Sequence, residues 1–211
     1  MNYPKARKNP KILTKHNHER VDNYYWLNDR EDTEVIDYLH AENAYTKKKL
    51  ESTEDLQKEL FDEIVAKIVK DDSSVPYESN GYWYYARYED GKDYPIYCRK
   101  KESLAADEVI ILDVNVLAEG HAYYAVGGLS ISPDNKMLCF GVDNVSRRIY
   151  TLYFKNLETG VVLEECIENT TGSATWANDN KTLFFTQMEA DTLRDYKIFR
   201  YEMGSKEEEE S

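Results

Sequence analysis

Two short stretches of this chain have nearly the same sequence, and each lies between strand-like runs. Residues 132–138 read Ser-Pro-Asp-Asn-Lys-Met-Leu, and 45 positions later residues 177–183 read Ala-Asn-Asp-Asn-Lys-Thr-Leu. Asn80-Gly81, followed by four aromatic residues, is a weaker copy of the same turn. Units of about 40–50 residues with four strands each are typical of β-propeller blades. A β-sandwich with coincident turns is the alternative, because Asp-Asn-Lys is ordinary hairpin chemistry.

After Pro76 the apolar residues follow a period of two, which indicates strands. The polar run 71–76 is interpreted as a linker between an arm, residues 1–75, and a β region, residues 76–211. Strands are expected at 82–88, 94–99, 109–114, 129–132, 137–142, 149–154, 161–164, 173–177, 182–187 and 197–201. They make two to three four-stranded antiparallel blades, whereas a ring needs at least about four. The sequence therefore predicts a mainly β fold, an incomplete β-propeller whose open sheet edges would let the chain self-associate.

Residues 1–75 have the pattern of an arm with two helices. The first 31 residues are expected to be irregular. One helix should begin near Asp32, whose side chain can cap free N–H groups, and its apolar residues recur at steps of three and four. A second helix is expected after Ser52, because Ser52-x-x-Asp55 resembles a capping box. Its wide apolar stripe, from Leu56 to Ile68, should pack against a substantial partner.

The composition argues against several classes of partner. The net charge is -13, with 40 acidic and 27 basic residues, whereas nucleic-acid binding depends on clustered Lys and Arg. No stretch approaches the ~20 apolar residues of a membrane span. The polar first residues lack the apolar segment of a signal peptide, so we expect a cytoplasmic protein. Cys98, Cys139 and Cys166 form no Cys-x-x-Cys pair and indicate neither a zinc site nor a disulfide framework.

Several stretches resemble a known family. The run Arg-Val-Asp-Asn-Tyr-Tyr-Trp-Leu-Asn-Asp-Arg at 20–30 resembles the amino-terminal signature of the prolyl oligopeptidase family of serine peptidases. Asp-Asp-Ser-Ser-Val-Pro-Tyr at 71–77 and Leu-Ala-Glu-Gly-His at 117–121 resemble its oligopeptidase B (protease II) branch. Further similar stretches follow in the expected order, at 81–85, 123–124, 146–148, 157–160 and 176–179. The resemblance thus covers nearly the whole chain.

This resemblance implies an enzyme in two parts. In the family a helical arm and a seven-bladed propeller precede an α/β-hydrolase domain with a Ser-Asp-His triad, and oligopeptidase B cleaves short peptides after Arg or Lys. This chain would supply the arm and the first two to three blades, without the catalytic domain. Its partners would be that hydrolase domain of the same protein and short basic peptides. The alternative is a stand-alone β-repeat module that binds a peptide or a protein.

The residues themselves argue against catalysis by this chain alone. Gly-Leu-Ser-Ile-Ser at 128–132 is the nearest approach to a Gly-x-Ser-x-Gly nucleophile elbow, but Ser132 stands where the second Gly belongs. Every histidine of the chain precedes this stretch: His16, His18, His40 and His121. The order Ser, Asp, His therefore cannot be completed, and no catalytic residue is expected. His16 and His18 lack a third ligand at metal-binding spacing, so neither a metal nor a cofactor is expected.

Three groups of residues are candidates for lesser roles. His121 and Tyr123 would line a substrate channel, and a structural histidine on a loop is the simpler interpretation. Arg147 and Arg148 would dock the hydrolase domain, because the planar fork of arginine suits interface ion pairs. The alternative for them is exposed charge on a blade. The Asp-Asp pair at 71–72 would attract a basic substrate side chain, unless it belongs to a solvated linker.

Overall fold

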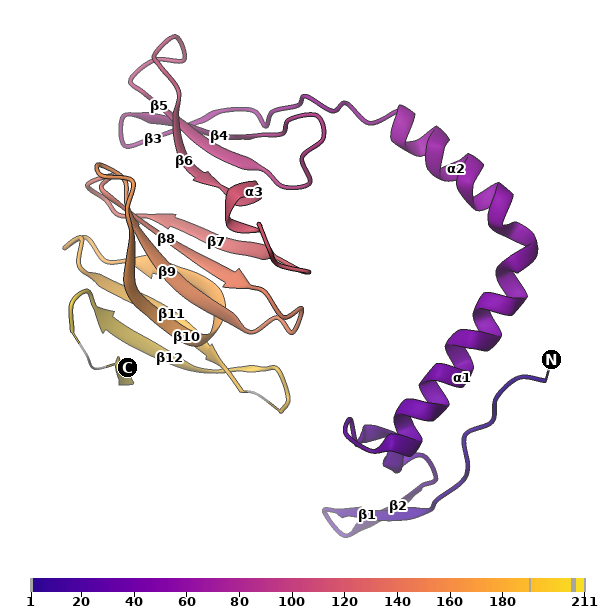
Figure 1. Cartoon of the computed structure of the whole chain (residues 1–211). Helices are drawn as coiled ribbons and strands as arrows, with labels where there is room; N and C mark the ends of the chain where they lie inside the picture. Colours follow the sequence, from indigo (N-terminus) through magenta and orange to yellow (C-terminus); the bar gives the residue numbers. More distant parts are fainter. Residues whose placement is uncertain (1, 190, 206–207, 211) are drawn as a thin grey trace. The chain divides into compact units, whose positions relative to one another are not determined.

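The computed structural model describes residues 2–189, 191–205 and 208–210 and separates into two compact units (Figure 1). The first unit is Met1–Ile68 and the second is Val69–Ser211. The first contains the helices α1 and α2, and the second contains β-sheets. Among the helices of the described residues, none is both long and apolar enough to cross a membrane.

The first helix begins where the sequence predicts. Helix α1 spans Thr33–Leu50, and the carboxylate of Asp32 accepts a hydrogen bond of 2.8 Å from the backbone N–H of Glu34. This bond satisfies one of the free donors at the helix N-terminus, as expected for an N-cap aspartate. Three lysines in the last turn complement the helix dipole.

The start of the second helix differs from the prediction. Helix α2 spans Glu54–Ala66 and follows a short 3-10 helix, Glu51–Thr53, which includes Ser52. The capping-box interpretation of Ser52 is therefore wrong. Thr53 holds the junction instead, because its hydroxyl donates to the Leu50 carbonyl at 2.7 Å and accepts from the Gln57 side chain at 2.7 Å. The apolar stripe of α2 is exposed, with Phe61 at 65%.

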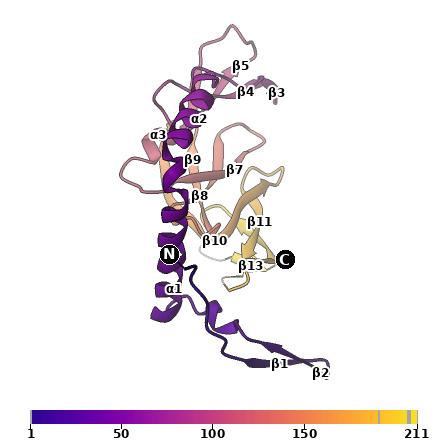
Figure 2. The same ribbon diagram turned by 90° about the vertical axis from the view of Figure 1, so that its right-hand side faces the viewer.

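Residues 2–31 are more regular than expected. Strands β1, Lys11–Lys15, and β2, His18–Asp22, form an antiparallel hairpin, and a 3-10 helix follows at Tyr25–Asn28 (Figure 2). The turn between the strands has His16 at φ 53° and Asn17 at φ 60°. A two-residue hairpin of type I′ needs positive φ at both positions, for which Asn-Gly is the usual signal. His-Asn gives that signal weakly, and the sequence therefore did not predict the hairpin.

The described residues of the second unit form two antiparallel sheets. One has four strands in the order β3-β4-β5-β6, and the other has seven in the order β13-β12-β11-β10-β9-β8-β7. Their bounds are β3 Tyr77–Ser79, β4 Tyr82–Arg87, β5 Ile96–Lys101, β6 Val109–Asp113, β7 Ala125–Ile131, β8 Met137–Asp143, β9 Tyr150–Asn156, β10 Val162–Trp176, β11 Thr182–Met188, β12 Asp195–Glu202 and β13 Glu208–Glu210. The short helix α3, Val114–Leu117, follows β6.

The seven-stranded sheet is two blades joined by one long strand. Strand β10 was predicted as two strands, at 161–164 and 173–177, but it is continuous from Val162 to Trp176. Its first part pairs with β9 and its second part with β11, and the register shifts between Thr170 and Ala174. This strand therefore closes one four-stranded blade and opens the next. Strands β3 to β6 form a further blade, so the described residues form three blades in all.

The repeated turns occupy the same place in each blade, between the first and second strands. Asn80, Asn135 and Asn180 all have positive φ, at 48°, 61° and 62°, a conformation that Asn adopts more readily than most residues. The turns also bond to one another. The Asn135 amide donates to the Asn80 carbonyl at 3.0 Å, and the Asn180 side chain accepts from the backbone N–H of Asp134 at 2.8 Å. The repeat thus joins neighbouring blades.

The core lies between successive blades. Leu138 and Phe140 of β8 belong to a cluster with residues of the first blade, and Leu183 and Phe185 of β11 belong to a cluster with the second blade. These four side chains are between 0% and 3% exposed, and each contributes roughly 1.5–3 kcal/mol by burial. The same repeat positions in the first blade are Trp83 and Tyr85, which are only half-buried.

The segment predicted as a linker belongs to the β unit. The backbone N–H of Ser74 donates to the Ala86 carbonyl at 2.8 Å, and that of Tyr88 donates to the Asp72 carbonyl at 2.8 Å. Ser73 also forms a β-bridge with Arg87. Residues 71–74 therefore extend the first blade alongside β4, a pairing that the polar sequence of the segment does not reveal.

Candidate functional site at one end of the second blade

A buried aspartate organises the loop between β8 and β9. Asp143 is the last residue of β8 and is 1% exposed. One carboxylate oxygen accepts from the backbone N–H groups of Val145 and Ser146, each at 2.9 Å, and the other accepts from that of Arg148 at 2.8 Å. A buried carboxylate needs such donors to offset its lost hydration. The loop is therefore fixed to the end of the strand.

This loop carries the two arginines that were predicted to dock another domain. Arg147 and Arg148 are exposed. Ser146 and Arg148 have positive φ, at 63° and 58°, so the backbone of the loop is tightly turned. Neither arginine makes an ion pair with any described residue. Asp143 thus holds two positive charges in solvent, available to an external carboxylate.

His121 and Tyr123 lie at the same end of the blade. They precede β7, whose first residue, Ala125, pairs in register with Asp143. The ring of His121 is 5.1 Å from that of the buried Tyr124, in keeping with a structural role, whereas Tyr123 is 41% exposed. The fold therefore brings the predicted channel residues and the predicted docking residues to one end of the second blade.

Tyr150 interacts electrostatically with Asp143 and Arg148, and it was not predicted as a site residue from the sequence. Burial raises the pKa of its hydroxyl, the negative charge of Asp143 raises it further, and the positive charge of Arg148 lowers it. The ring also packs on Gly172, where an added Cβ would lie 2.7 Å from the ring. Gly172 has φ 89°, so the β10 backbone approaches closely only because this residue is glycine. The sequence gives no local sign of this contact.

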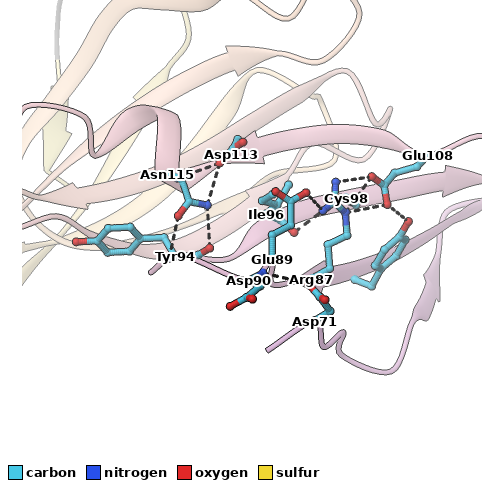
Figure 3. A network of polar contacts seen from close by, with 11 residues as sticks. Asp71, Arg87, Glu89, Asp90, Tyr94, Ile96, Cys98, Glu108, Asp113 and Asn115 are labelled. Atoms are coloured by element: carbon cyan, nitrogen blue, oxygen red, sulfur yellow. Dashed lines mark hydrogen bonds and ion pairs between the residues drawn. The ribbon is translucent and has the colours of Figure 1, made fainter. Parts of the chain in front are cut away.

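A polar network covers part of the first blade, as Figure 3 shows. The Arg87 guanidinium pairs with Glu108 at 3.0 Å and also with Glu89, and the Tyr85 hydroxyl donates to Glu108 at 2.6 Å. Burial would raise the pKa of Glu108, but the hydrogen bonds from Tyr85 and Arg87 outweigh it and lower that pKa. Burial raises the pKa of the neighbouring Cys98 thiol to about 11. Cys98 is therefore a protonated, unreactive thiol at neutral pH.

A second part of this network fixes loop ends of the first blade (Figure 3). The Asn115 side chain donates to the Tyr94 carbonyl at 2.9 Å and accepts from the backbone N–H of Tyr94 at 3.0 Å. The carboxylate of Asp71, a candidate for attracting basic substrates, accepts from the backbone N–H of Asp90 at 3.0 Å. This bond gives Asp71 a structural role that the sequence did not indicate.

The serines of the predicted elbow-like stretch have structural roles. Ser132 is fully buried, and its hydroxyl donates to Asp134 at 2.6 Å and accepts from the backbone N–H of Met137 at 2.9 Å. The Ser130 carbonyl accepts from the Trp176 indole at 3.0 Å, which ties the second blade to the third. Within the described ranges, no three His, Cys, Asp or Glu side chains are grouped as a metal site.

The sequence matches a family described as "Prolyl oligopeptidase, N-terminal beta-propeller domain" over residues 3–211. This chain belongs to the prolyl oligopeptidase family. Both the resemblance noted in the sequence and the propeller fold class with a helical arm are thereby confirmed. Within the family, the chain is 39% identical to dipeptidyl aminopeptidase BI of Pseudoxanthomonas mexicana, over 96% of this chain and 30% of that protein. It is 31% identical to protease 2 of Moraxella lacunata, over 97% of this chain and 31% of that protein.

Solved structures of the family have a similar fold over this part of the chain. Oligopeptidase B from Leishmania major has a TM-score of 0.88 and 29% identity, over 99% of this chain and 32% of that one. Oligopeptidase B from Trypanosoma brucei, in a closed form with covalently bound antipain, has a TM-score of 0.84 and 28% identity, over 97% and 31%. The chain thus spans about a third of the length of the family members that it matches.

Proposed function

We propose that this chain is the amino-terminal propeller portion of a longer serine peptidase of the oligopeptidase B type. An α/β-hydrolase domain of the same protein would perform the hydrolysis, on short peptides, after Arg or Lys. The observation that carries the proposal is the match to oligopeptidase B from Leishmania major, which covers 99% of this chain but 32% of that protein. The remaining two thirds of such a protein would contain the reactive serine.

In this proposal the chain selects and admits substrates and takes no part in the chemistry. The hydrolase domain would supply a serine, activated by a histidine, that forms an acyl-enzyme stabilised in an oxyanion hole. Arg147 and Arg148 would pair with carboxylates of that domain, and His121 and Tyr123 would lie beside the path of the peptide. The net charge of -13 would favour basic peptides.

We also propose a cytoplasmic location. Cys98, Cys139 and Cys166 are free thiols, and Cys166 is exposed. Free thiols suit a reducing compartment.

The experiment compares the full-length gene product with the 211-residue chain on N-benzoyl-arginine 4-nitroanilide. We expect the full-length protein to release nitroaniline and the chain to release none above the buffer rate. An alanine in place of arginine in the same substrate is the control and should react much more slowly. Hydrolysis by the chain itself, or equal rates on both substrates, would refute the proposal.

A second candidate is an aminopeptidase that releases dipeptides. The observation that favours it is the 39% identity to dipeptidyl aminopeptidase BI, against 29% to oligopeptidase B from Leishmania major. Such an enzyme requires a free amino group two residues before the cleaved bond. Glycyl-arginine 4-nitroanilide, with and without an N-benzoyl group, separates the two activities. An oligopeptidase cleaves the blocked form, whereas a dipeptidyl aminopeptidase cleaves only the free form.

A further inference from the structure

A cavity of about 430 Å³ lies between the first and second blades. This volume is within the usual range of sites for small organic ligands. The first blade contributes several tyrosines to its wall, and the second blade contributes two aliphatic side chains. The main wall residues are Tyr77, Ser79, Tyr84, Tyr97, Leu129 and Ile131.

The strand register places three tyrosine rings on the cavity side of the first blade. Tyr77 of β3 pairs directly with Tyr84 of β4. Tyr97 of β5 pairs with Ala86, two residues after Tyr84, so the three tyrosines share one face of the sheet. This face is turned toward the second blade, because Tyr97 and Leu129 both pack against the buried cluster that the two blades share. The Tyr77 and Tyr84 rings are 5.7 Å apart and inclined at 32°, an arrangement that a further ring can extend.

The same face carries hydroxyl groups that have no partner. Ser79 lies two residues after Tyr77 in β3, so it is on the face of the tyrosines. Among the described residues, none forms a hydrogen bond with the hydroxyl of Tyr77, Ser79 or Tyr97. None of these three oxygens is among the fully buried unpaired atoms of the described residues, so each is accessible to a ligand. Burial raises the pKa of the Tyr97 hydroxyl, which is therefore protonated at neutral pH and can donate.

The wall of the cavity is uncharged. Within the described part of the chain, no Asp, Glu, Lys, Arg or His side chain lines it. An ion that entered would lose its hydration without gaining a counter-ion, which is costly. A neutral molecule loses only hydrogen bonds to water, and the free hydroxyls can replace these. The wall therefore favours a neutral ligand, and its tyrosines favour an aromatic one, since ring pairs gain energy beyond simple burial.

From these observations we infer that the cavity between the first two blades binds an uncharged aromatic compound that carries a hydrogen-bonding group such as an amide. Its ring system contacts Tyr77 and the aliphatic side chains, and its polar group bonds to the hydroxyl of Tyr97 or Ser79. Asn135, in the turn before β8, also lines the cavity, whereas the loop with the two arginines follows β8. The inference thus concerns a site separate from the peptidase chemistry and stands whichever peptidase activity the full-length protein has.

The test uses isothermal titration calorimetry on the 211-residue chain with indole-3-acetamide as the probe. We expect binding at millimolar concentration or tighter. Indole-3-acetate and tryptamine have the same ring system with a negative and a positive charge. Each should bind at least about tenfold more weakly, because the wall offers no counter-charge. Hexanamide has the amide without a ring and should also bind more weakly. No binding of indole-3-acetamide, or equal or tighter binding of any of the other three compounds, would overturn the inference.

Two variants and a control locate the site. Tyr77→Ala should fold normally, because this side chain is 62% exposed, and should weaken the binding of indole-3-acetamide several-fold. Tyr97→Phe keeps the ring and removes only the free hydroxyl, and it should also weaken binding. Tyr196→Ala removes a tyrosine of similar exposure, 51%, from β12 of the third blade and should leave binding unchanged. Full binding by both Tyr77→Ala and Tyr97→Phe, or an equal loss in Tyr196→Ala, would refute the location.

Discussion

Replacing Asp143 tests whether a buried carboxylate holds the loop that carries the two arginines. The carboxylate is 1% exposed and accepts three backbone N–H bonds, from Val145, Ser146 and Arg148. A hydrogen bond to a charged group contributes about 1.5–3 kcal/mol. The loop residues are exposed, so water replaces part of the lost bonding. We therefore expect Asp143→Ala to lower the free energy of unfolding by roughly 2–4 kcal/mol.

Asp143→Asn separates the charge from the shape. The amide keeps one acceptor oxygen, but its NH₂ group faces a backbone N–H that in the unaltered protein donates to the second carboxylate oxygen. We expect a loss of about 1–3 kcal/mol, between the unaltered protein and Asp143→Ala. The measurement is urea unfolding of the 211-residue chain, followed by tryptophan fluorescence, with unfolding free energies obtained by linear extrapolation.

The matched control is Asp179→Asn. Asp179 also accepts bonds from the backbone N–H groups of Lys181 and Thr182, at 3.0 and 2.8 Å, but in an exposed turn. Its replacement should have a much smaller effect at neutral pH. The expected role of Asp143 is refuted if the free energy of unfolding of Asp143→Ala is within about 0.5 kcal/mol of that of the unaltered chain. It is also refuted if Asp143→Asn and Asp179→Asn lower the free energy of unfolding equally.

Three further outcomes are expected. Gly172→Ala should lower the free energy of unfolding by about 1–3 kcal/mol in urea, because its Cβ would meet the Tyr150 ring and its φ is 89°. The Thr182 hydroxyl and backbone lower the pKa of Asp179 to about 2, so this carboxylate stabilises the fold above the unfolded-state pKa, and that contribution disappears as the pH falls through about 2. The loss of stability as the pH falls, followed by circular dichroism, should therefore be shallower in Asp179→Asn than in the unaltered chain. In the full-length protein, replacing Arg147 and Arg148 together by Gln should lower kcat/KM several-fold on the arginine nitroanilide while leaving urea unfolding of the 211-residue chain unchanged.

The blade architecture was largely predictable because it depends on local rules. The repeated turn requires a positive φ at Asn135 and Asn180, which asparagine tolerates. Alternation of apolar residues then sets the strands on either side. The N-cap of α1 at Asp32 is equally local, since the bonded N–H belongs to Glu34. These features require only that neighbouring residues adopt compatible backbone angles.

The candidate site was only partly predictable. Exposed arginines at 147–148 and the histidine at 121 are visible as residue types, but their common location depends on the register of β7 and β8. Tyr150 was missed because its importance comes from packing on Gly172, a residue of a different strand. The burial of Arg99 was missed because a charged residue in a strand is normally exposed, whereas this guanidinium donates to the Asn135 carbonyl of the second blade.

What this sequence determines by itself is the repeating unit: turns that favour left-handed asparagine, strands with a period of two, and an arm with two helices. What only the tertiary structure decides is how the units are joined and what lies between them. Strand β10 is continuous because its two ends pair with different blades, and the Trp176 indole bonds to Ser130, 46 residues away. Such contacts join residues that are distant in the chain, so they depend on how whole sheets stack, and no local pattern encodes them.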